Sequence, residues 1–314
     1  MNNINICIIG AGGQLGSKLV ENFSKNKLFK IYALDKFFQN KLSYDGVNYI
    51  SLDLNESFEE KFKQVPNSNT IFINCVGVQH VLFSRKIIDL NFKLNKKLFD
   101  YINSNYFNYR FIHMSSLSVD NAKTKEIIPG VGNPINLYGK SKLLFEKYLY
   151  ENSNNNITII RPAAFYDSKI SNNLLNFFDL LVNKIFFLPS QNIYRSFLSL
   201  EYFSKFLEEY ILSEDKHEIF EIGDVSPIEF NSLLKFIKKS NIQINSKIFY
   251  LPKVLFRTVG HIGYILEKLG LHISFLTIIG EFAYDFVATK EPDSYGLVKQ
   301  NTYENFRDII KGIN

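Results

Sequence analysis

Cysteine is scarce in this sequence, and the scarcity excludes two kinds of stabilising framework. Cys7 and Cys75 are the only cysteines among 314 residues. Two cysteines cannot build a disulfide framework or a zinc-ligand cluster, and such low usage suits a reducing compartment. The first residues also lack a basic stretch followed by a long apolar core, the pattern of a signal peptide. We therefore expect a cytoplasmic protein.

Blocks of like charge are absent as well. Lysine and arginine number 36 against 31 aspartates and glutamates, which gives a net charge of +5. The lysines are scattered among asparagines, so the sequence predicts a solvated surface and no nucleic-acid partner. A positive balance would still help to attract a nucleotide diphosphate.

No apolar run is long enough to predict a membrane-spanning helix. The most apolar segment, Leu251–Ala288, is interrupted by Lys253, Arg257, His261, Glu267, Lys268, Glu281 and Asp285. An amphipathic face of this segment could dock on a membrane through its basic residues. Packing of its helices within the protein is the favoured interpretation.

The first half of the chain alternates short apolar runs with amphipathic stretches. The apolar runs predict strands at Ile4–Ile9, Phe29–Leu34, Val47–Leu52, Thr70–Val76, Tyr109–Met114 and Ile157–Ile160. The amphipathic stretches predict helices at Gln14–Lys25, Ser57–Gln64, Asp89–Asn103 and Tyr138–Asn152. This alternation indicates an α/β fold with a doubly wound parallel sheet, of the Rossmann type.

The alternation of strand and helix patterns ends after Pro162, and helical patterns dominate the rest of the chain. Helices are expected at Ile170–Lys184, Leu200–Leu212, Ile228–Lys239, Pro252–Leu269 and Ile273–Val287, with one more strand at Glu218–Ile222. We expect residues 1–165 to form a dinucleotide-binding domain and residues 166–314 a smaller, mostly helical substrate lobe. Part of 195–225 is expected to return to the sheet.

A glycine-rich turn joins the first predicted strand to the first predicted helix. Gly10, Gly13 and Gly16 recur every third residue, with Gln14 and Leu15 between the last two. Glycines let the backbone approach a ligand closely, and a helix N-terminus offers free N–H groups and a positive dipole end. The strand, turn and helix together predict a site for a dinucleotide diphosphate.

Several polar or small residues follow predicted strands directly, where ligands bind in parallel sheets. They are Gly10, Asp35, Asp53, Gly77 and Ser115. Asp35 follows the glycine turn by about twenty residues, the place of a carboxylate that binds ribose hydroxyls. Such a carboxylate repels a 2′-phosphate, which favours NAD, although the neighbouring Lys36 leaves NADP possible. The plain alternative for Asp35 is a turn residue.

Asp53 has two interpretations that the sequence does not separate. Its carboxylate could accept a hydrogen bond from an adenine amino group. It could equally be the N-cap of the helix that follows.

The catalytic candidates lie around the last helix of the first half. Tyr138 and Lys142 are four residues apart, so they share one helix face. A tyrosine has an ordinary pKa of about 10, and a nearby ammonium is expected to lower it. Tyr138 could then exchange a proton with an alcohol or ketone during hydride transfer. Ser116 could hold the reacting oxygen, or simply close its strand in a serine turn.

These motifs together resemble the extended short-chain dehydrogenases/reductases, the NAD-dependent epimerase/dehydratase family that acts on nucleotide sugars. The matching elements are the glycine turn, Asp35, Asp53-Leu54, Gly77, Asn91, Ser115-Ser116, Tyr138-Gly139-Lys140-Ser141-Lys142 with Glu146, and Arg161-Pro162.

The resemblance implies a catalytic trio of Ser116, Tyr138 and Lys142, with Lys142 also holding the nicotinamide ribose. It implies that the other matched residues, among them Leu54, Gly77, Asn91, Ser115 and Pro162, contact NAD. Arg195 would contact the diphosphate of a nucleotide-sugar substrate, because its planar fork suits that group. The family also implies a possible homodimer.

Departures from the family pattern narrow the chemistry. Leu117 and Ser118 follow Ser116 where dehydratases place acids, so dehydration is disfavoured. Ala163 stands where many epimerases have asparagine, whereas the sequence around Gln14 and Arg195 is more similar to reductases of 4-keto sugar nucleotides. We expect hydride transfer at a sugar carbon, C4 by resemblance, by a reductase or 4-epimerase that feeds surface polysaccharide synthesis. A non-catalytic dinucleotide-binding subunit or redox sensor with the same fold stays open.

Overall fold

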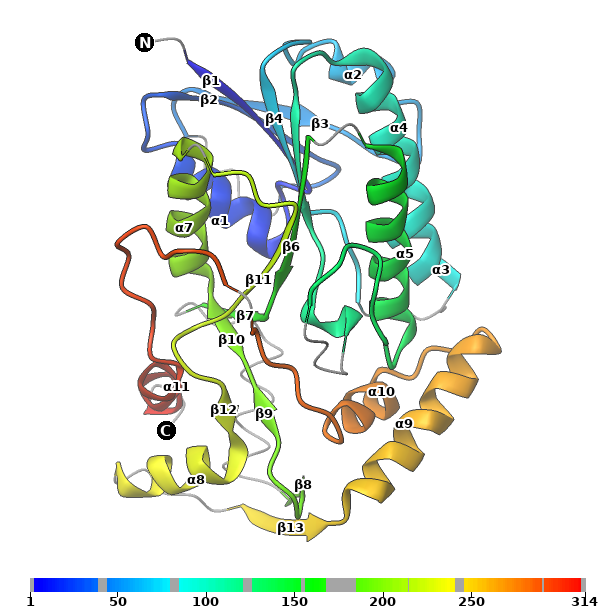
Figure 1. Cartoon of the computed structure of the whole chain (residues 1–314), viewed down its shortest axis with the longest axis vertical. Coiled ribbons are helices and arrows are strands. Elements are labelled where there is room, and N and C mark those ends of the chain that lie inside the picture. Colours follow the sequence, from blue (N-terminus) through cyan, green and yellow to red (C-terminus); the bar gives the residue numbers. More distant parts are fainter. Residues whose placement is uncertain are drawn as a thin grey trace.

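The computed structural model describes residues 3–38, 44–79, 85–120, 126–153, 156–167, 185–213, 215–240, 246–289 and 291–311. Figure 1 shows the sheet with its helices in the upper part of the molecule and a second group of helices and short strands below.

A seven-stranded sheet organises the upper part. Its strands are β1 (Ile4–Ile9), β2 (Phe29–Asp35), β3 (Val47–Ser51), β4 (Thr70–Asn74), β5 (Arg110–Met114), β6 (Ile157–Pro162) and β11 (Ile219–Ile222). They run in the order β11-β6-β5-β4-β1-β2-β3, and every neighbouring pair is parallel. The predicted Rossmann-type sheet is confirmed. Because β1 lies near the middle, the glycine turn that follows it opens at the point where the strand order reverses.

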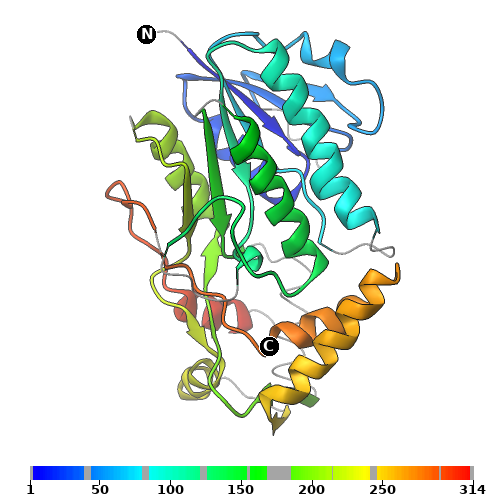
Figure 2. The same ribbon diagram turned by 45° about the vertical axis from the view of Figure 1, so that its right-hand side comes forward.

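Helices cover both faces of the sheet (Figures 1 and 2). On one face lie α1 (Gln14–Phe23) and α7 (Leu200–Leu212), which pack against each other. On the other lie α2 (Glu59–Phe62), α3 (Arg85–Ile88), α4 (Asn95–Asn105) and α5 (Leu137–Asn152). Both faces of the central strands are therefore buried, as their continuous apolar sequence requires.

Alternate residues of β1 divide the core into two clusters. Ile6 and Ile8 belong to the cluster under α1 and α7, which includes Phe23 and Phe206. Cys7 and Ile9 belong to the cluster under α4 and α5. The period-2 geometry of a strand makes this division, since neighbouring side chains point to opposite faces.

Two short irregular helices accompany the regular ones, and only the first of them falls within a predicted helix. The predicted helix Asp89–Asn103 begins with a π-helical turn, Asp89–Leu94, before α4. A 3₁₀ turn, Leu117–Val119, follows β5 directly. Both lie beside the sheet edge where ligands bind, and π-helical turns are frequent at functional sites.

The lower part contains more strands than the sequence suggested. Its helices are α8 (Phe230–Lys239), α9 (Lys253–Lys268), α10 (Ser274–Glu281) and α11 (Thr302–Lys311). Three two-stranded sheets accompany them: β7 (Ala164–Tyr166) with β10 (Phe197–Ser199), β9 (Tyr194–Arg195) with β12 (Ile228–Glu229), and β8 (Ile185–Pro189) with β13 (Lys247–Leu251). These strands are two to five residues long, too short for periodicity to reveal.

Two predicted helices of this part need comment. The helix expected at Ile273–Val287 ends at Glu281, so α10 is shorter than predicted. The helix expected at Ile170–Lys184 lies outside the described residues. The strand expected at Glu218–Ile222 is β11, and it pairs with β6 in the main sheet.

Within the described ranges, no helix is both long and apolar enough to cross a membrane.

Candidate active site

A cavity of about 540 Å³ opens beyond the carboxyl ends of the strands. It extends from the glycine turn to the lower part of the molecule. Most of the predicted site residues line it: Gly10, Gly13, Gln14, Leu15, Gly16, Gly77, Ser115, Ser116, Tyr138, Lys142, Pro162 and Arg195. The fold thus brings together groups that are up to 185 residues apart in the chain.

The glycine turn forms one wall of the cavity. Gly10 has a φ of +84°, a conformation that other residues rarely adopt. A Cβ atom on Gly16 would lie 2.1 Å from the Gly10 carbonyl oxygen, so only glycine lets α1 start this close to β1. Gly13 caps α1 without any side-chain hydrogen bond, which leaves that end of the helix to the cavity.

Asp35 holds the turn from the end of β2. Its Oδ2 accepts a hydrogen bond from the Gly12 N–H at 2.9 Å, and its Oδ1 accepts one from the Phe37 N–H at 3.1 Å. A carboxylate has about four acceptor positions, so these two bonds leave capacity for a ribose hydroxyl. Asp35 lies next to the loop rather than on the cavity wall.

Asp53 and Leu54 lie away from the cavity. Asp53 pairs with Lys36, with 2.5 Å between Nζ and Oδ2, and it also accepts the Asn55 N–H. The hydrogen bond with Lys36 lowers the pKa of Asp53 to about 2. The N-cap of the next helix is Phe58, so the N-cap interpretation of Asp53 was wrong. Leu54 is buried in the core beneath α4 and α5.

Helix α5 presents Tyr138 and Lys142 to the cavity from its first turns. Asn136 begins this helix by accepting the Gly139 N–H at 2.8 Å. The Lys142 ammonium donates to the Met114 carbonyl at 2.9 Å and to the Val76 carbonyl at 3.4 Å. These bonds fix it between the ends of β4 and β5.

Gly77 gives Lys142 the space that it occupies. A Cβ atom on Gly77 would lie 2.7 Å from the Lys142 Nζ. Any side chain at position 77 would therefore displace the ammonium from the cavity wall.

Burial acts in opposite directions on the two catalytic candidates. It lowers the pKa of Lys142 to about 8, and it raises the pKa of Tyr138 to about 12. A hydrogen bond with Ser116 lowers the Tyr138 pKa, and the charge of Glu281 raises it. The expected lowering by Lys142 is therefore not seen, because the Lys142 ammonium is turned to the two carbonyls and loss of water dominates.

The two serines after β5 have different partners. The Ser116 hydroxyl accepts the Ser118 N–H at 3.1 Å, which closes the 3₁₀ turn, and it also bonds Tyr138. The Ser115 hydroxyl donates to the buried Glu146 carboxylate. Glu146 is in turn paired with Arg161, so Ser115 joins the support beneath the cavity.

Asn91 supports the cavity from behind. Its side chain is fully buried in the π-helical turn. It accepts the Val78 N–H at 2.8 Å and donates to the Val78 carbonyl at 2.8 Å and the Ser141 hydroxyl at 3.0 Å. The residue therefore fixes the loop after β4 against α5 and does not line the cavity.

Arg195 reaches the cavity from β9. Its guanidinium lies 5.0 Å from the centre of the Phe286 ring, and one nitrogen is 3.5 Å from Glu281. Its Nε and Nη2 are buried without a hydrogen-bond partner. Buried unpaired donors are costly, so these two N–H groups fit a site that binds an anion.

Glu281 is the cavity residue that sequence reasoning missed as a functional candidate. It ends α10, its pKa is raised by burial, and it accepts the Asn136 amide at 3.0 Å. No motif marks it, because it reaches the cavity only through the packing of α10. Gln79 also lines the cavity.

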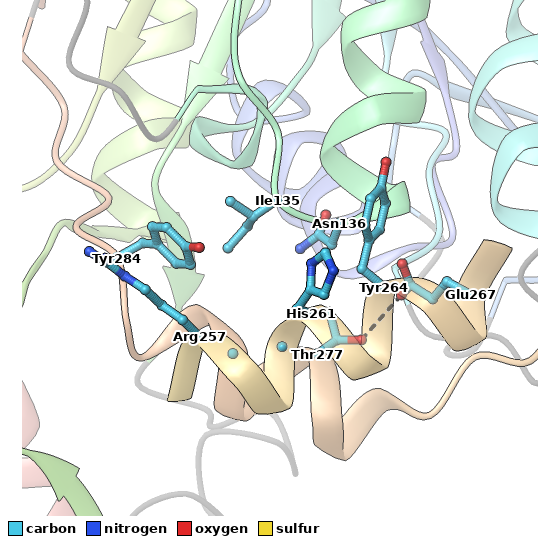
Figure 3. Close-up of a pocket in the computed structure, with 10 residues that line it drawn as sticks. Ile135, Asn136, Arg257, His261, Tyr264, Glu267, Thr277 and Tyr284 are labelled. Atoms are coloured by element: carbon cyan, nitrogen blue, oxygen red, sulfur yellow. Dashed lines mark hydrogen bonds between the residues drawn. The ribbon is translucent and has the colours of Figure 1, made fainter. Parts of the chain in front are cut away.

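A second, smaller cavity of about 150 Å³ lies where α9 and α10 meet the start of α5. Figure 3 shows His261 and Tyr264 of α9 pointing toward the side of Asn136, whereas the guanidinium of Arg257 reaches Tyr284 and lies 5.6 Å from the centre of its ring. Glu267 accepts the Leu137 N–H at 3.0 Å across this junction. The pair of helices is thereby tied to the helix that carries Tyr138.

No group of three or more His, Cys, Asp or Glu side chains in the described parts of the chain could hold a metal ion.

Solved structures with the same fold cover this chain almost completely. The UDP-N-acetylglucosamine 4-epimerase of Methanobrevibacter ruminantium, solved with UDP-N-acetylmuramic acid, has a TM-score of 0.70 at 14% identity. The comparison covers 100% of this chain and 99% of that one. The UDP-glucuronic acid 4-epimerase of Bacillus cereus, solved with UDP-glucuronic acid and NAD, has a TM-score of 0.67 at 15% identity, covering 99% and 100%.

A third structure covers a smaller share of the chain. It is the hypothetical dTDP-4-dehydrorhamnose reductase of Sulfolobus tokodaii, with a TM-score of 0.59 at 22% identity over 78% of this chain and 85% of that one. At such identities these three structures establish a shared fold.

The sequence itself establishes the family. Residues 6–179, more than half of the chain, match the model of the NAD dependent epimerase/dehydratase family. This segment contains the glycine turn, both serines after β5, and the tyrosine and lysine of α5. The chain belongs to the NAD dependent epimerase/dehydratase family.

Proposed function

We propose that this protein transfers hydride between a nicotinamide cofactor and a ring carbon of a nucleotide sugar, as a 4-keto sugar reductase or a 4-epimerase. One observation carries the proposal: a single cavity is lined both by the glycine turn and by Ser116, Tyr138 and Lys142. The cofactor loop and the proton-transferring groups therefore face the same space.

The residues of this wall fit NAD. The uncapped start of α1 suits a diphosphate, and Asp35 beside it suits ribose hydroxyls. NAD, when bound, accepts or supplies the hydride. Lys142 would hold the nicotinamide ribose from its fixed place between β4 and β5. Asp35 favours NAD over NADP because a carboxylate repels a 2′-phosphate.

Tyr138 would move the proton. With a pKa near 12 its phenol is protonated at neutral pH, so it can donate a proton to a ketone oxygen as hydride reaches the carbon. Ser116 would hold that oxygen from the other side. The protonated resting state favours the reductive direction, whereas epimerisation also needs Tyr138 to take the proton back.

Arg195 would bind the substrate diphosphate. Its unpaired Nε and Nη2 supply a fork for one phosphate, and its guanidinium lies against the ring of Phe286. The similar structures from Methanobrevibacter and Bacillus were solved with uridine diphosphate sugars. The nucleotide sugar that this protein releases would serve surface polysaccharide synthesis in the cytoplasm.

Cofactor consumption separates the two reactions. A reductase oxidises added NADH in proportion to the substrate consumed, whereas an epimerase interconverts two sugars without net change in NADH. The absorbance of NADH, followed over a panel of keto and hydroxy nucleotide sugars, measures this directly. NAD binding without turnover of any member would instead support a dinucleotide-binding subunit or sensor.

The Tyr138→Phe variant tests the proton step. We expect kcat to fall by about 10²-fold to 10⁴-fold, because the ring remains but the proton donor is lost. Tyr150→Phe is the matched control, since Tyr150 is half-exposed on the same helix. Unchanged turnover in Tyr138→Phe would contradict the assignment.

A further inference from the structure

Glu281 brings a carboxylate into the large cavity. Among the described residues that line this cavity, it is the only aspartate or glutamate, and Lys142 and Arg195 are the only lysine and arginine. Glu281 is 9% exposed and is the last residue of α10, at the negative end of the helix dipole. Burial and the dipole both disfavour a carboxylate there, and a residue kept at such a position is a candidate for function.

Glu281 lies between the two groups that would hold the ends of the substrate. Its Oε2 is 3.5 Å from Nη1 of Arg195, the proposed partner of the diphosphate. Toward the other end, burial raises the pKa of Tyr138 and the charge of Glu281 raises it further, so the carboxylate acts on the proposed proton donor as well. In a nucleotide sugar, the sugar ring joins the diphosphate to the carbon that would react at Tyr138. The ring would therefore pass Glu281.

Two neighbours favour the charged form of Glu281 and leave part of it open. The Asn136 amide donates to Oε1 at 3.0 Å, and the Arg195 guanidinium lies next to Oε2. Burial raises the pKa of Glu281, whereas the charge of Arg195 and the bond from Asn136 lower it. A carboxylate has about four acceptor positions, so capacity remains for a group inside the cavity.

The carboxylate is also fixed in place. Gly280 precedes it, and a Cβ on Gly280 would lie 2.3 Å from the Gly260 Cα, so the end of α10 is in backbone contact with α9. Asn136, which donates to Glu281, is the N-cap of α5. Glu281 is thereby connected to the helix that carries Tyr138, and this connection restricts its withdrawal from a ligand.

We propose that Glu281 selects the sugar: it accepts a hydrogen bond from a hydroxyl group of an uncharged sugar, and it rejects a sugar that carries a carboxylate. The inference rests on the proposed function, because it assumes a nucleotide sugar in this cavity. Two negative charges repel each other more strongly where little water separates them, whereas a hydroxyl donor can use the open acceptor positions. The expected substrates are therefore nucleotides of neutral hexoses or deoxyhexoses, and nucleotide uronic acids are excluded.

Binding measurements on the NAD-loaded full chain test the proposal without requiring turnover. The probes are UDP-glucose and UDP-glucuronic acid, which differ only at C6, and UDP alone, which carries the diphosphate without a sugar. We expect calorimetry to show that UDP-glucose binds more tightly than UDP-glucuronic acid by about tenfold or more, since like charges placed together in a binding site are strongly unfavourable.

Glu281→Gln removes the charge and keeps the shape of the side chain. We expect it to strengthen the binding of UDP-glucuronic acid by about tenfold, relative to the change seen with UDP alone. The comparison with UDP is needed because loss of the carboxylate also frees Arg195 for any diphosphate. Glu267→Gln is the matched control: Glu267 is 2% exposed and bonds the start of α5, but it lines the second cavity and not the large one, so the discrimination should persist.

Two results would overturn the role of Glu281 alone. The wild type could bind both sugar nucleotides equally well or prefer the uronic acid, and this comparison needs no variant. Glu281→Gln could also strengthen the binding of all three probes by the same factor, which would show that Glu281 only competes with the diphosphate for Arg195. A chain that binds none of the probes would instead contradict the proposed function. Circular dichroism and NAD binding verify that each variant is folded.

Discussion

At the scale of single residues, the buried surroundings of Lys142 set the pKa of its ammonium. Lys142 is 3% exposed, and its ammonium donates hydrogen bonds to two backbone carbonyls. The carboxylate of the neighbouring Glu146 forms an ion pair with Arg161. Removal of water lowers the pKa of Lys142 to about 8. A lysine in this state carries its charge at neutral pH but releases a proton readily above it.

This pKa predicts a stability difference that depends on pH. Between pH 8 and pH 10.5 the unfolded chain keeps the Lys142 proton and the folded chain has released it, so folding becomes more favourable as pH rises. The free energy of unfolding of the wild type should rise relative to Lys142→Met across this window, by up to about 3 kcal/mol. Below pH 8 the difference should be flat.

Urea unfolding at several pH values measures the effect. Lys140→Met is the control, since Lys140 is exposed on the same helix. A difference between wild type and Lys142→Met that stays constant up to pH 10.5 would contradict the lowered pKa.

At the scale of elements, one buried cluster fastens β6 to α5. Arg161 bonds Glu146 twice, at 2.6 and 3.0 Å, and also the Val131 carbonyl at 2.9 Å. Both side chains are at most 1% exposed. Ser115 at the end of β5 joins the same carboxylate, so the cluster holds three elements below the cavity.

Removing one partner of this cluster should cost much more than removing both. Arg161→Met leaves a buried carboxylate unpaired, and we expect a loss of about 3–5 kcal/mol in the free energy of unfolding. The double variant Arg161→Met and Glu146→Leu should recover a large part of that loss. Chemical denaturation of the three proteins measures the difference, and equal losses in single and double variants would refute the explanation.

At the scale of the whole molecule, the chain leaves the sheet and later returns to it. Helix α7 packs on α1, where Asn22 and Asn26 donate to the Glu208 carboxylate at 2.6 and 2.8 Å. Strand β11 then extends the sheet beside β6. Core residues under α1 and α7 therefore come from both sides of the boundary that the sequence predicts near residue 165, where part of 195–225 was expected to return to the sheet.

A fragment of residues 1–165 should consequently fail to fold as a stable unit. Without α7, the apolar side of α1 with Leu19, Val20 and Phe23 would lose its cover. We expect a poorly soluble fragment without a cooperative thermal transition, whereas residues 1–225 should retain more structure. Calorimetry of both fragments decides the matter, and a sharp transition in the shorter one would support the predicted boundary.

Much of the sheet and of the main cavity was predictable because their signals are local. Most strands of the first half are short, largely apolar runs, and the glycine turn has a spacing that the backbone requires. The lower part was less predictable. Its strands are two to five residues long, and β9 and β12 pair across more than thirty residues of chain, which no local pattern records.

By itself the sequence determined the Rossmann-type sheet, the family and the set of residues around the glycine turn and Tyr138, because each depends on short-range periodicity or on motif spacing. Only the tertiary structure decided the hydrogen-bond partners and the protonation of those residues. It turned Lys142 toward two carbonyls, kept Tyr138 protonated and brought Glu281 to Arg195. Burial and charge at these positions come from segments far apart in the chain, so they exist only once it is folded.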